Sequence, residues 1–254
     1  MTRPLALVTG AAQGIGRATA LAFAHAGYDL ALADLTAESL AETAAQVEEA
    51  GAQALVIAAD VAEESDWVQA MTAVEKAFGR LDALINNAGV SGPVAPLQDV
   101  SVAAFDQVLA VNVRGVFLGM KHARPLLLAT PGASIVNVGS VSGLTGGSNT
   151  IAYTASKHAV TGMTMLAANE FAPHGVRVNA VCPAPTDTAM MQALAAQMSP
   201  DDPERFHRSF AKFIPLARYA DAAEIAAAIV FLASPAAGFI TGVTLPVDGG
   251  VRAR

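Results

Sequence analysis

Short apolar runs bounded by glycine, aspartate or asparagine recur along the chain, with longer helix-like stretches between them. The runs are continuously apolar rather than alternating, which is typical of strands covered on both faces. They predict strands at Leu5–Thr9, Leu30–Ala33, Ala54–Ala58, Ala83–Asn86, Ser134–Val138, Arg177–Cys182 and Thr244–Val247. The stretches between them predict helices at Arg17–His25, Ala37–Ala50, Glu64–Phe78, Val102–Leu127, Ile151–Ala172 and Ala222–Ala233.

This alternation of strands and helices predicts an α/β fold, with a doubly wound parallel sheet of about seven strands and helices on both faces. Such sheets bind ligands at the carboxyl ends of their strands. The composition, 53% apolar and 15% charged, fits a well-buried core. A length of 254 residues suits one domain, so we expect residues 1–254 to form a single domain.

One segment, about residues 184–221, breaks the alternation between the sixth and seventh strands. It is rich in methionine and phenylalanine and contains Ser-Pro-Asp-Asp-Pro at 199–203. A long insertion at the ligand edge is usually functional, so we predict a substrate lid. The alternative is a helical hairpin that packs on the domain and has no ligand role.

A glycine-rich turn, Gly10-Ala-Ala-Gln13-Gly14-Ile15-Gly16, joins the first strand to the first helix. Such a turn brings backbone N–H groups close to a pyrophosphate at the helix's positive end. The spacing is Gly-x3-Gly-x-Gly. Asp34 ends the second strand, about where an acidic residue would meet an adenosine ribose. Alternatively, Asp34 caps the helix that begins near Thr36.

Tyr153 and Lys157 are four residues apart and share one face of a predicted helix, with Ser140 thirteen positions before Tyr153. An ammonium beside a phenol lowers a pKa that is normally near 10. The tyrosine then becomes a usable proton donor and acceptor. By themselves, two such side chains usually mark a solvated helix edge, but the separate nucleotide signature favours catalysis.

Together these motifs resemble the short-chain dehydrogenase/reductase family over essentially the whole chain. The matching pieces follow the family's order, and they are 9–16, Asp60–Val61, Asn86–Gly89, Asn112, Ser140, Tyr153 with Lys157, and 183–188. The resemblance implies a Rossmann-type fold and hydride transfer to or from a nicotinamide dinucleotide. One departure is Ala184 after Pro183, where the family usually has glycine.

The resemblance also implies catalytic roles. Tyr153 would be the acid/base, Lys157 would tune it and bind the nicotinamide ribose, and Ser140 would orient the substrate oxygen. Asn112 would hold a water that relays protons. Asparagine is locally unfavourable inside a helix, so a special role or a kink is expected there.

The cofactor contacts implied by the resemblance are Gly10, Gln13, Gly14, Ile15, Gly16, Asp34, Asp60, Val61, Asn87, Ala88, Gly89, Tyr153, Lys157, Pro183, Thr186 and Thr188. We expect NAD, because the Asp34 carboxylate would repel the 2′-phosphate of NADP. Arg17 is a weak argument for binding a 2′-phosphate, because it lies on the helix beyond the turn, where it could face solvent. Asp60 could instead cap the helix after Glu63.

The lid sequence resembles that of members acting on small cyclic alcohols and ketones, or on sugar-derived polyols. We expect the substrate to contact Ser142, Leu144, Thr150, Met190 and Met191. The alternative enzyme is a 3-oxoacyl-thioester reductase acting on an acyl-carrier-protein or CoA substrate. A catalytically inactive binding protein is disfavoured, since such proteins typically lose the Tyr, the Lys or a turn glycine.

Composition narrows the partners and the compartment. A net charge of −7 argues against nucleic acid, and five histidines without ligand spacing argue against a metal site. No uncharged apolar stretch reaches the length of a membrane span, about eighteen residues. The N-terminus leads straight into a strand, leaving no room for a signal peptide. With Cys182 as the single cysteine, the sequence favours a cytoplasmic protein without an internal disulfide.

The helical stretches 102–127 and 151–172 carry apolar residues around more of their circumference than one sheet face can cover. Relatives in the resembled family pack these helices against their copies across a two-fold axis. We therefore expect a homotetramer, with a second interface near 242–250. The alternative is that the lid or a neighbouring helix covers them within one subunit.

Overall fold

The computed structural model describes residues 3–253; residues 1, 2 and 254, which the single-domain and N-terminal predictions include, lie outside it. Seven parallel strands form one sheet in the order β3-β2-β1-β4-β5-β6-β7. Their bounds are β1 Leu5–Thr9, β2 Asp29–Asp34, β3 Ala54–Ala58, β4 Ala83–Asn86, β5 Ser134–Val138, β6 Arg177–Pro183 and β7 Thr244–Val247. The α/β class, the parallel sheet and its seven strands are as predicted, with β2 and β6 slightly longer.

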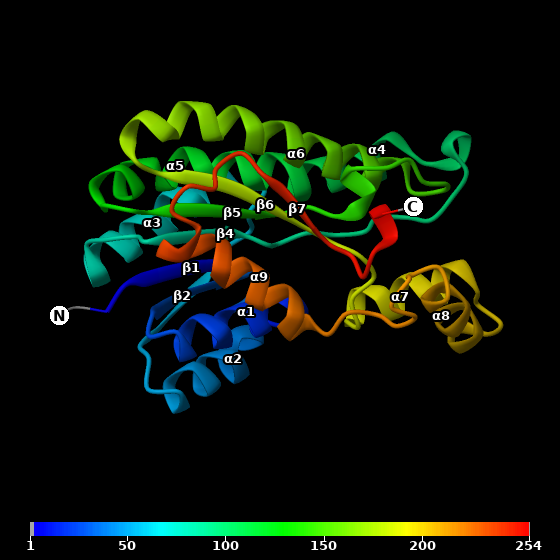
Figure 1. Cartoon of the computed structure of the whole chain (residues 1–254), viewed down its shortest axis with the longest axis horizontal. Helices are drawn as coiled ribbons and strands as arrows, with labels where there is room; N and C mark the ends of the chain where they lie inside the picture. The colour runs from blue at the N-terminus through cyan, green and yellow to red at the C-terminus, as the bar shows by residue number, and fades with distance from the viewer. Residues whose placement is uncertain (1–2, 254) are drawn as a thin grey trace.

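Helices cover both faces of the sheet (Figure 1). On one face lie α1 Gly14–His25, α2 Ala37–Glu49 and α9 Ala222–Ala233. On the other lie α3 Glu64–Phe78, α4 Val102–Leu109, α5 Gly115–Ala129 and α6 Ile151–Phe171. Each face has its own apolar cluster, and the residues of β1, β2, β4, β5 and β6 are almost wholly buried, whereas the edge strands β3 and β7 are partly exposed. This explains why the strand sequences are continuously apolar.

The strand order reverses between β1 and β4, which are neighbours in the sheet although two strands separate them in sequence. The connections after β1 and β4 therefore leave in opposite directions. Such a reversal opens a crevice at the carboxyl ends of the strands. The glycine-rich turn follows β1 and Asn87–Gly89 follows β4, so both predicted motifs lie at this crevice.

The predicted helix at Val102–Leu127 is interrupted. A π-helical turn, η2 Ala110–Arg114, separates α4 from α5 and contains the fully buried Asn112. The expected irregularity at Asn112 is thus a π-turn, a feature that is frequent at functional sites. By length and composition the run Val102–Ala129 could cross a membrane. Here it packs on the sheet as a core helix, through residues such as Leu118, Ala123 and Leu127.

The segment 184–221, called the lid segment below, contains α7 Ala189–Met198 and α8 Pro203–Ala211. Both helices stand out from the body at the end where the strands finish (Figure 1). A bridge between Thr186 and Ala220 closes the segment at its base. Met191, Ile214 and Tyr219 form its own small apolar cluster, the lid cluster.

A chain of buried polar side chains fixes α6 against the sheet. Asn86 Nδ2 donates to Asn137 Oδ1 at 2.9 Å, and Asn137 Nδ2 donates to Thr164 Oγ1 at 2.9 Å. Buried amides are costly unless they are paired, so these bonds favour one placement of the helix. Because Tyr153 and Lys157 lie on α6, the chain also sets where they sit relative to β4 and β5.

Candidate active site

The backbone of the glycine-rich turn leaves no room for a side chain at Gly16 and favours glycine at Gly10 and Gly14. Gly10 and Gly14 have φ values of +65° and +55°, which favour glycine. A Cβ on Gly16 would lie 1.9 Å from the carbonyl oxygen of Gly10. The helix begins at Gly14, earlier than the predicted Arg17, so its first N–H groups follow the turn directly. Those N–H groups have no partner within the helix, and they form a cradle suited to a pyrophosphate.

The end of β4 holds this turn in place. Asn87 Nδ2 donates to the carbonyl oxygens of Thr9, at 2.8 Å, and Gly10, at 3.1 Å. The Thr9 hydroxyl accepts the N–H groups of Asn87 and Ala88, both at 3.0 Å. Sequence reasoning missed Thr9, although its position as the polar last residue of an apolar strand was visible.

Asp34 does not cap helix α2. Its carboxylate accepts the N–H groups of Ala12, at 3.0 Å, and Leu35, at 2.9 Å. Thr36 caps α2 instead, since its hydroxyl accepts the N–H of Ser39 at 3.3 Å. The capping alternative for Asp34 is therefore wrong. The side chain stays partly exposed at the end of β2.

Arg17 does not face solvent as the sequence suggested. Its Nε donates to the Ala12 carbonyl at 3.0 Å and to Thr43 Oγ1 at 3.1 Å, and its Nη1 pairs with Glu42 at 2.7 Å. The guanidinium braces the glycine turn from behind because helix α2 approaches it closely. Its charge is balanced by Glu42.

Asp60 and Val61 follow β3. Asp60 Oδ1 accepts the N–H of Ala62 at 2.9 Å, while Glu63 occupies the N-cap position of α3. The capping alternative for Asp60 is thus also wrong. The Val61 carbonyl accepts Trp67 Nε1 at 3.0 Å. These contacts fix the loop after β3 beside the crevice.

Ser140, Tyr153 and Lys157 come together where β5 ends against α6. The Ser140 hydroxyl accepts the N–H of Ser142 at 3.1 Å and hydrogen-bonds with Tyr153. Lys157 Nζ donates to the Val138 carbonyl at 2.8 Å and lies 5.6 Å from the centre of the Tyr153 ring. The three residues that were predicted as a unit are therefore neighbours.

Burial has the largest effect on the pKa values of Tyr153 and Lys157. It lowers the pKa of Lys157 from 10.5 to about 8. Burial also raises the pKa of Tyr153, opposed by the hydrogen bond with Ser140. The expectation that Lys157 lowers the tyrosine pKa is not met in this structure. The Lys157 ammonium lies over the ring and bonds a carbonyl, while withdrawal from water disfavours both charged forms.

Asn112 links three elements through its side chain. Its Oδ1 accepts the N–H of Val90 at 2.8 Å, and its Nδ2 donates to the Val90 carbonyl at 2.9 Å and to Ser156 Oγ at 3.0 Å. A Cβ on Gly89 would lie 3.2 Å from Asn112 Oδ1 and 3.6 Å from Lys157 Nζ. The loop after β4 is therefore clamped between η2 and α6.

The segment Pro183–Thr188 forms the opposite wall. The N–H of Ala184 donates to the Val247 carbonyl at 3.1 Å, and Thr186 Oγ1 donates to the Ala184 carbonyl at 3.0 Å. Ala184 is buried without disturbing these contacts. The methyl carbon of Thr188 lies 3.3 Å from where a Cβ on Gly14 would be. The first and last predicted cofactor motifs thus meet across the crevice.

The predicted substrate residues fall into two groups. Ser142 and Leu144 follow Ser140, and Thr150 directly precedes α6, the helix that carries Tyr153. Met190 on α7 is 42% exposed, whereas Met191 is buried in the lid cluster. Of the two predicted methionines, Met190 is therefore the one with free surface.

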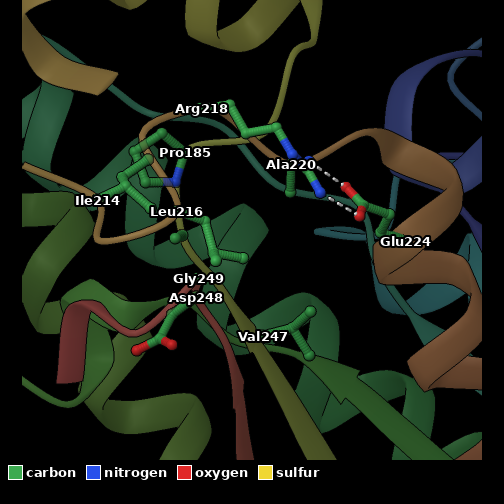
Figure 2. Close-up of a pocket in the computed structure, with 10 residues that line it drawn as sticks. Pro185, Ile214, Leu216, Arg218, Ala220, Glu224, Val247, Asp248 and Gly249 are labelled. Carbon is green, nitrogen blue, oxygen red and sulfur yellow. Dashed lines mark hydrogen bonds and ion pairs between the residues drawn. The ribbon is translucent and has the colours of Figure 1, made fainter. Parts of the chain in front are cut away.

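A cavity of about 110 Å³ lies between the base of the lid segment and the ends of β6 and β7 (Figure 2). Ile214 and Leu216 project into it, and Val247–Gly249 form its opposite side. Arg218 donates to both carboxylate oxygens of Glu224, at 2.7 Å each, along one edge. The residues that line this cavity do not include Ser140, Tyr153 or Lys157. The sequence did not predict a cavity at this place.

The chain is similar to known proteins over nearly its whole length. The family model described as enoyl-(acyl carrier protein) reductase matches residues 10–252. Levodione reductase of Leifsonia aquatica is 37% identical over 99% of this chain and 95% of its own, and a crystal structure of levodione reductase aligns with a TM-score of 0.97. Cis-4-hydroxycyclohexanecarboxylate dehydrogenase of Sinomonas cyclohexanicum is 39% identical, covering 98% and 96% of the two chains. The crystal structure of NAD⁺-bound xylitol dehydrogenase has a TM-score of 0.94 at 35% identity, covering 97% and 98%.

Proposed function

The chain belongs to the short-chain dehydrogenase/reductase family, and we propose that it is an NAD(H)-dependent oxidoreductase that interconverts a small secondary alcohol and its ketone. One observation carries the proposal. Ser140, Tyr153 and Lys157 adjoin a crevice that contains a glycine cradle and the partly exposed carboxylate of Asp34. The combination supplies proton transfer and dinucleotide binding in one place.

The residues present fit a nicotinamide dinucleotide. The N-terminal N–H groups of α1 would hold the pyrophosphate, Asp34 would bind the adenosine ribose, and Asn87–Gly89 would pass beside that ribose. Pro183, Thr186 and Thr188 would contact the nicotinamide end. NAD⁺-bound xylitol dehydrogenase, the structural relative described above, supports the choice of NAD. When bound, the nicotinamide donates or accepts the hydride.

The chain's own residues manage the proton. In oxidation, the Tyr153 phenolate takes the alcohol proton; in reduction, the Tyr153 hydroxyl donates to the developing alkoxide. Ser140 orients the substrate oxygen through its hydroxyl. Lys157, with its pKa lowered to about 8 by burial, can exchange protons near neutral pH and bind the nicotinamide ribose.

We assign Asn112 to the same proton path. Its side-chain amide is engaged with Val90 and Ser156, so a relay water would be held by its backbone carbonyl rather than by the amide. A π-turn shifts backbone carbonyls out of the regular helical ladder, which supports this assignment.

The substrate is proposed to be a small cyclic alcohol, a polyol or a sugar-derived alcohol, or the matching ketone. Relatives named for a hydroxycyclohexane carboxylate and for xylitol support this class. Ser142, Leu144, Thr150 and Met190 would line a mildly apolar pocket under the lid segment, with Met191 supporting the lid from within. A 3-oxoacyl-thioester reductase is the second candidate; the matching family description shares with it only the acyl-carrier-protein substrate, since it names an enoyl rather than a 3-oxoacyl reductase.

The protein is proposed to be a cytoplasmic homotetramer. Met165 and Leu166 on α6 are 50% and 64% exposed, and Phe117 on α5 is 50% exposed. Apolar side chains at this density on two adjacent helices support a self-complementary interface between copies. The exposed Phe239, before β7, supports a second interface near 242–250.

A panel assay tests the function. The protein is offered NAD⁺ or NADP⁺ with cyclic alcohols, polyols and sugar acids, and NADH or NADPH with the matching ketones and with 3-oxoacyl-CoA. Tyr153→Phe serves as the inactive control. Turnover of an alcohol with NAD⁺ supports the proposal. Turnover confined to 3-oxoacyl-CoA favours the second candidate, and absence of any hydride transfer overturns both.

A further inference from the structure

The C-terminal tail, residues 248–253, crosses the carboxyl end of the sheet after β7. The Asp248 carboxylate accepts the N–H groups of Gly250, at 2.9 Å, and Arg252, at 2.8 Å. Gly249 and Gly250 have φ values of +58° and +92°. The carboxylate and the two glycines therefore bend the tail into one defined turn, which directs Arg252 back over the body.

The tail contacts the lid segment through Gly249 and Val251. The Gly249 carbonyl accepts the N–H of Leu216 at 3.2 Å. A Cβ on Gly249 would lie 2.7 Å from Ile214 Cγ2, and Val251 packs against the lid cluster. Figure 2 shows Ile214 and Leu216 close to Gly249 at this junction. The tail and the base of the lid therefore pack as one unit.

Arg252 holds the wall that follows Ser140. Its Nη1 donates to the Leu144 carbonyl at 2.5 Å. The neighbouring Gly143 is pressed against α6, because a Cβ there would lie 2.5 Å from the Lys157 carbonyl oxygen. Beyond Leu144, residues 145–149 are exposed and include two glycines. Arg252 thus anchors the wall at the last point before the chain enters this exposed stretch.

We propose that Arg252 is a positioning residue for substrate binding: it fixes the Ser140–Leu144 wall through the Leu144 carbonyl and couples that wall to the lid segment through the tail. A guanidinium suits this task because its planar donors hold a fixed direction. The inference rests on the proposed function in so far as Ser142 and Leu144 face the substrate. Its effect is on substrate affinity, because the contacts proposed for the dinucleotide lie on other elements.

Kinetics of the full chain test the positioning role. Arg252→Ala should raise KM for the alcohol by about fivefold, the size of effect expected when one ordinary hydrogen bond is lost. The kcat should change less, and the Kd for NADH, measured by fluorescence, should stay within about twofold. Arg252→Lys should recover part of the loss, since an ammonium can still donate one bond. Lys76→Ala, which removes an exposed cation on α3 outside the lid segment, is the control and should leave all three constants unchanged.

Hydrogen–deuterium exchange tests the same inference without turnover. Arg252→Ala should speed exchange in peptides covering 141–149, and Lys76→Ala should not. If the wild-type protein oxidised no alcohol, the proposed function would be wrong. The exchange measurement would still show whether Arg252 anchors residues 141–149. Unchanged exchange, or an unchanged KM in an active protein, overturns the proposal. An equal loss of thermal stability, NADH affinity and KM also overturns it, because that result describes general unfolding.

Discussion

The ammonium of Lys157 lies over the face of the Tyr153 ring, 5.6 Å from its centre, and donates its hydrogen bond to the Val138 carbonyl. The lysine therefore meets the tyrosine ring rather than being hydrogen-bonded to its hydroxyl. Both groups are withdrawn from water, and burial moves the pKa of each toward its neutral form. Burial thus favours protonated Tyr153, so the phenolate that takes the alcohol proton in oxidation is the less favoured form, while Lys157 can change charge near pH 8.

This burial predicts a pH-dependent stability. The folded pKa of Lys157, about 8, lies below its ordinary 10.5, so the unfolded chain binds more protons between these values. The free energy of unfolding must then rise as the pH increases from about 8 to 10.5. The same contribution is lost as the pH falls back through this range. Lys157→Met should remove the rise. Denaturant unfolding at several pH values, wild type against variant, measures it, and parallel curves would contradict the assignment.

Tyr153→Phe should reduce kcat by about two or more orders of magnitude, the scale of general acid–base groups. The ring and its packing stay, so NADH affinity should change little. Lys157→Ala, by contrast, should weaken both NADH binding and kcat. The measurement is steady-state turnover with fluorescence titration of NADH. A Tyr153→Phe protein with most of its kcat would show that another group transfers the proton.

The Asp34 carboxylate should make NAD(H) the preferred cofactor by about tenfold or more in kcat/KM, because it repels a 2′-phosphate at close range. Asp34→Ser combined with Leu35→Arg should narrow or reverse the preference. Leu35 is 67% exposed, so the arginine adds charge without displacing core. Leu35→Arg alone is the control. Equal use of NADPH by the wild-type protein would count against this role of Asp34.

Arg177 should contribute to stability rather than to activity. Its guanidinium donates to the carbonyls of Leu232, Ala233 and Ser234 where α9 ends, at 2.5, 3.1 and 3.1 Å. Arg177→Met should lower the free energy of unfolding by about 2 kcal/mol, as expected for hydrogen bonds to a charged group. Arg208→Met, on an exposed face, should change it little. Equal losses of unfolding free energy in Arg177→Met and Arg208→Met would show that Arg177 does not specifically stabilise the end of α9.

The homotetramer can be tested in solution. Light scattering at micromolar concentration should give the mass of four chains, and Leu166→Glu should shift the mass to a smaller species. Leu166 is 64% exposed in one chain, so the variant should keep its thermal stability as an isolated subunit. A monomeric wild-type protein would contradict the proposal, and a dimer would remove only the second interface.

The sequence predicted elements whose signals are local. Continuous apolar runs located every strand, and the glycine turn and Ser140, Tyr153 and Lys157 were placed in the correct neighbourhood. Features that depend on contacts between distant segments were missed. The partners of Arg17 and Arg252 lie on other elements, and the π-turn was expected only as an irregularity at Asn112. The opposite direction of the Tyr153 pKa reflects the same limit, because desolvation is a property of the packed site.

The buried amides of Asn86 and Asn137 also act on how the sheet assembles. These two residues are directly opposite each other in the β4–β5 ladder. A slip of β5 by one position would turn Asn137 toward the apolar cluster beneath α1 and α9 and leave both amides without partners. A sheet misaligned by one position would therefore lose the Asn86–Asn137 bond, which the native sheet keeps although Asn86 Oδ1 has no partner there. The asparagines thereby discriminate against wrong registers during folding, before any ligand is present.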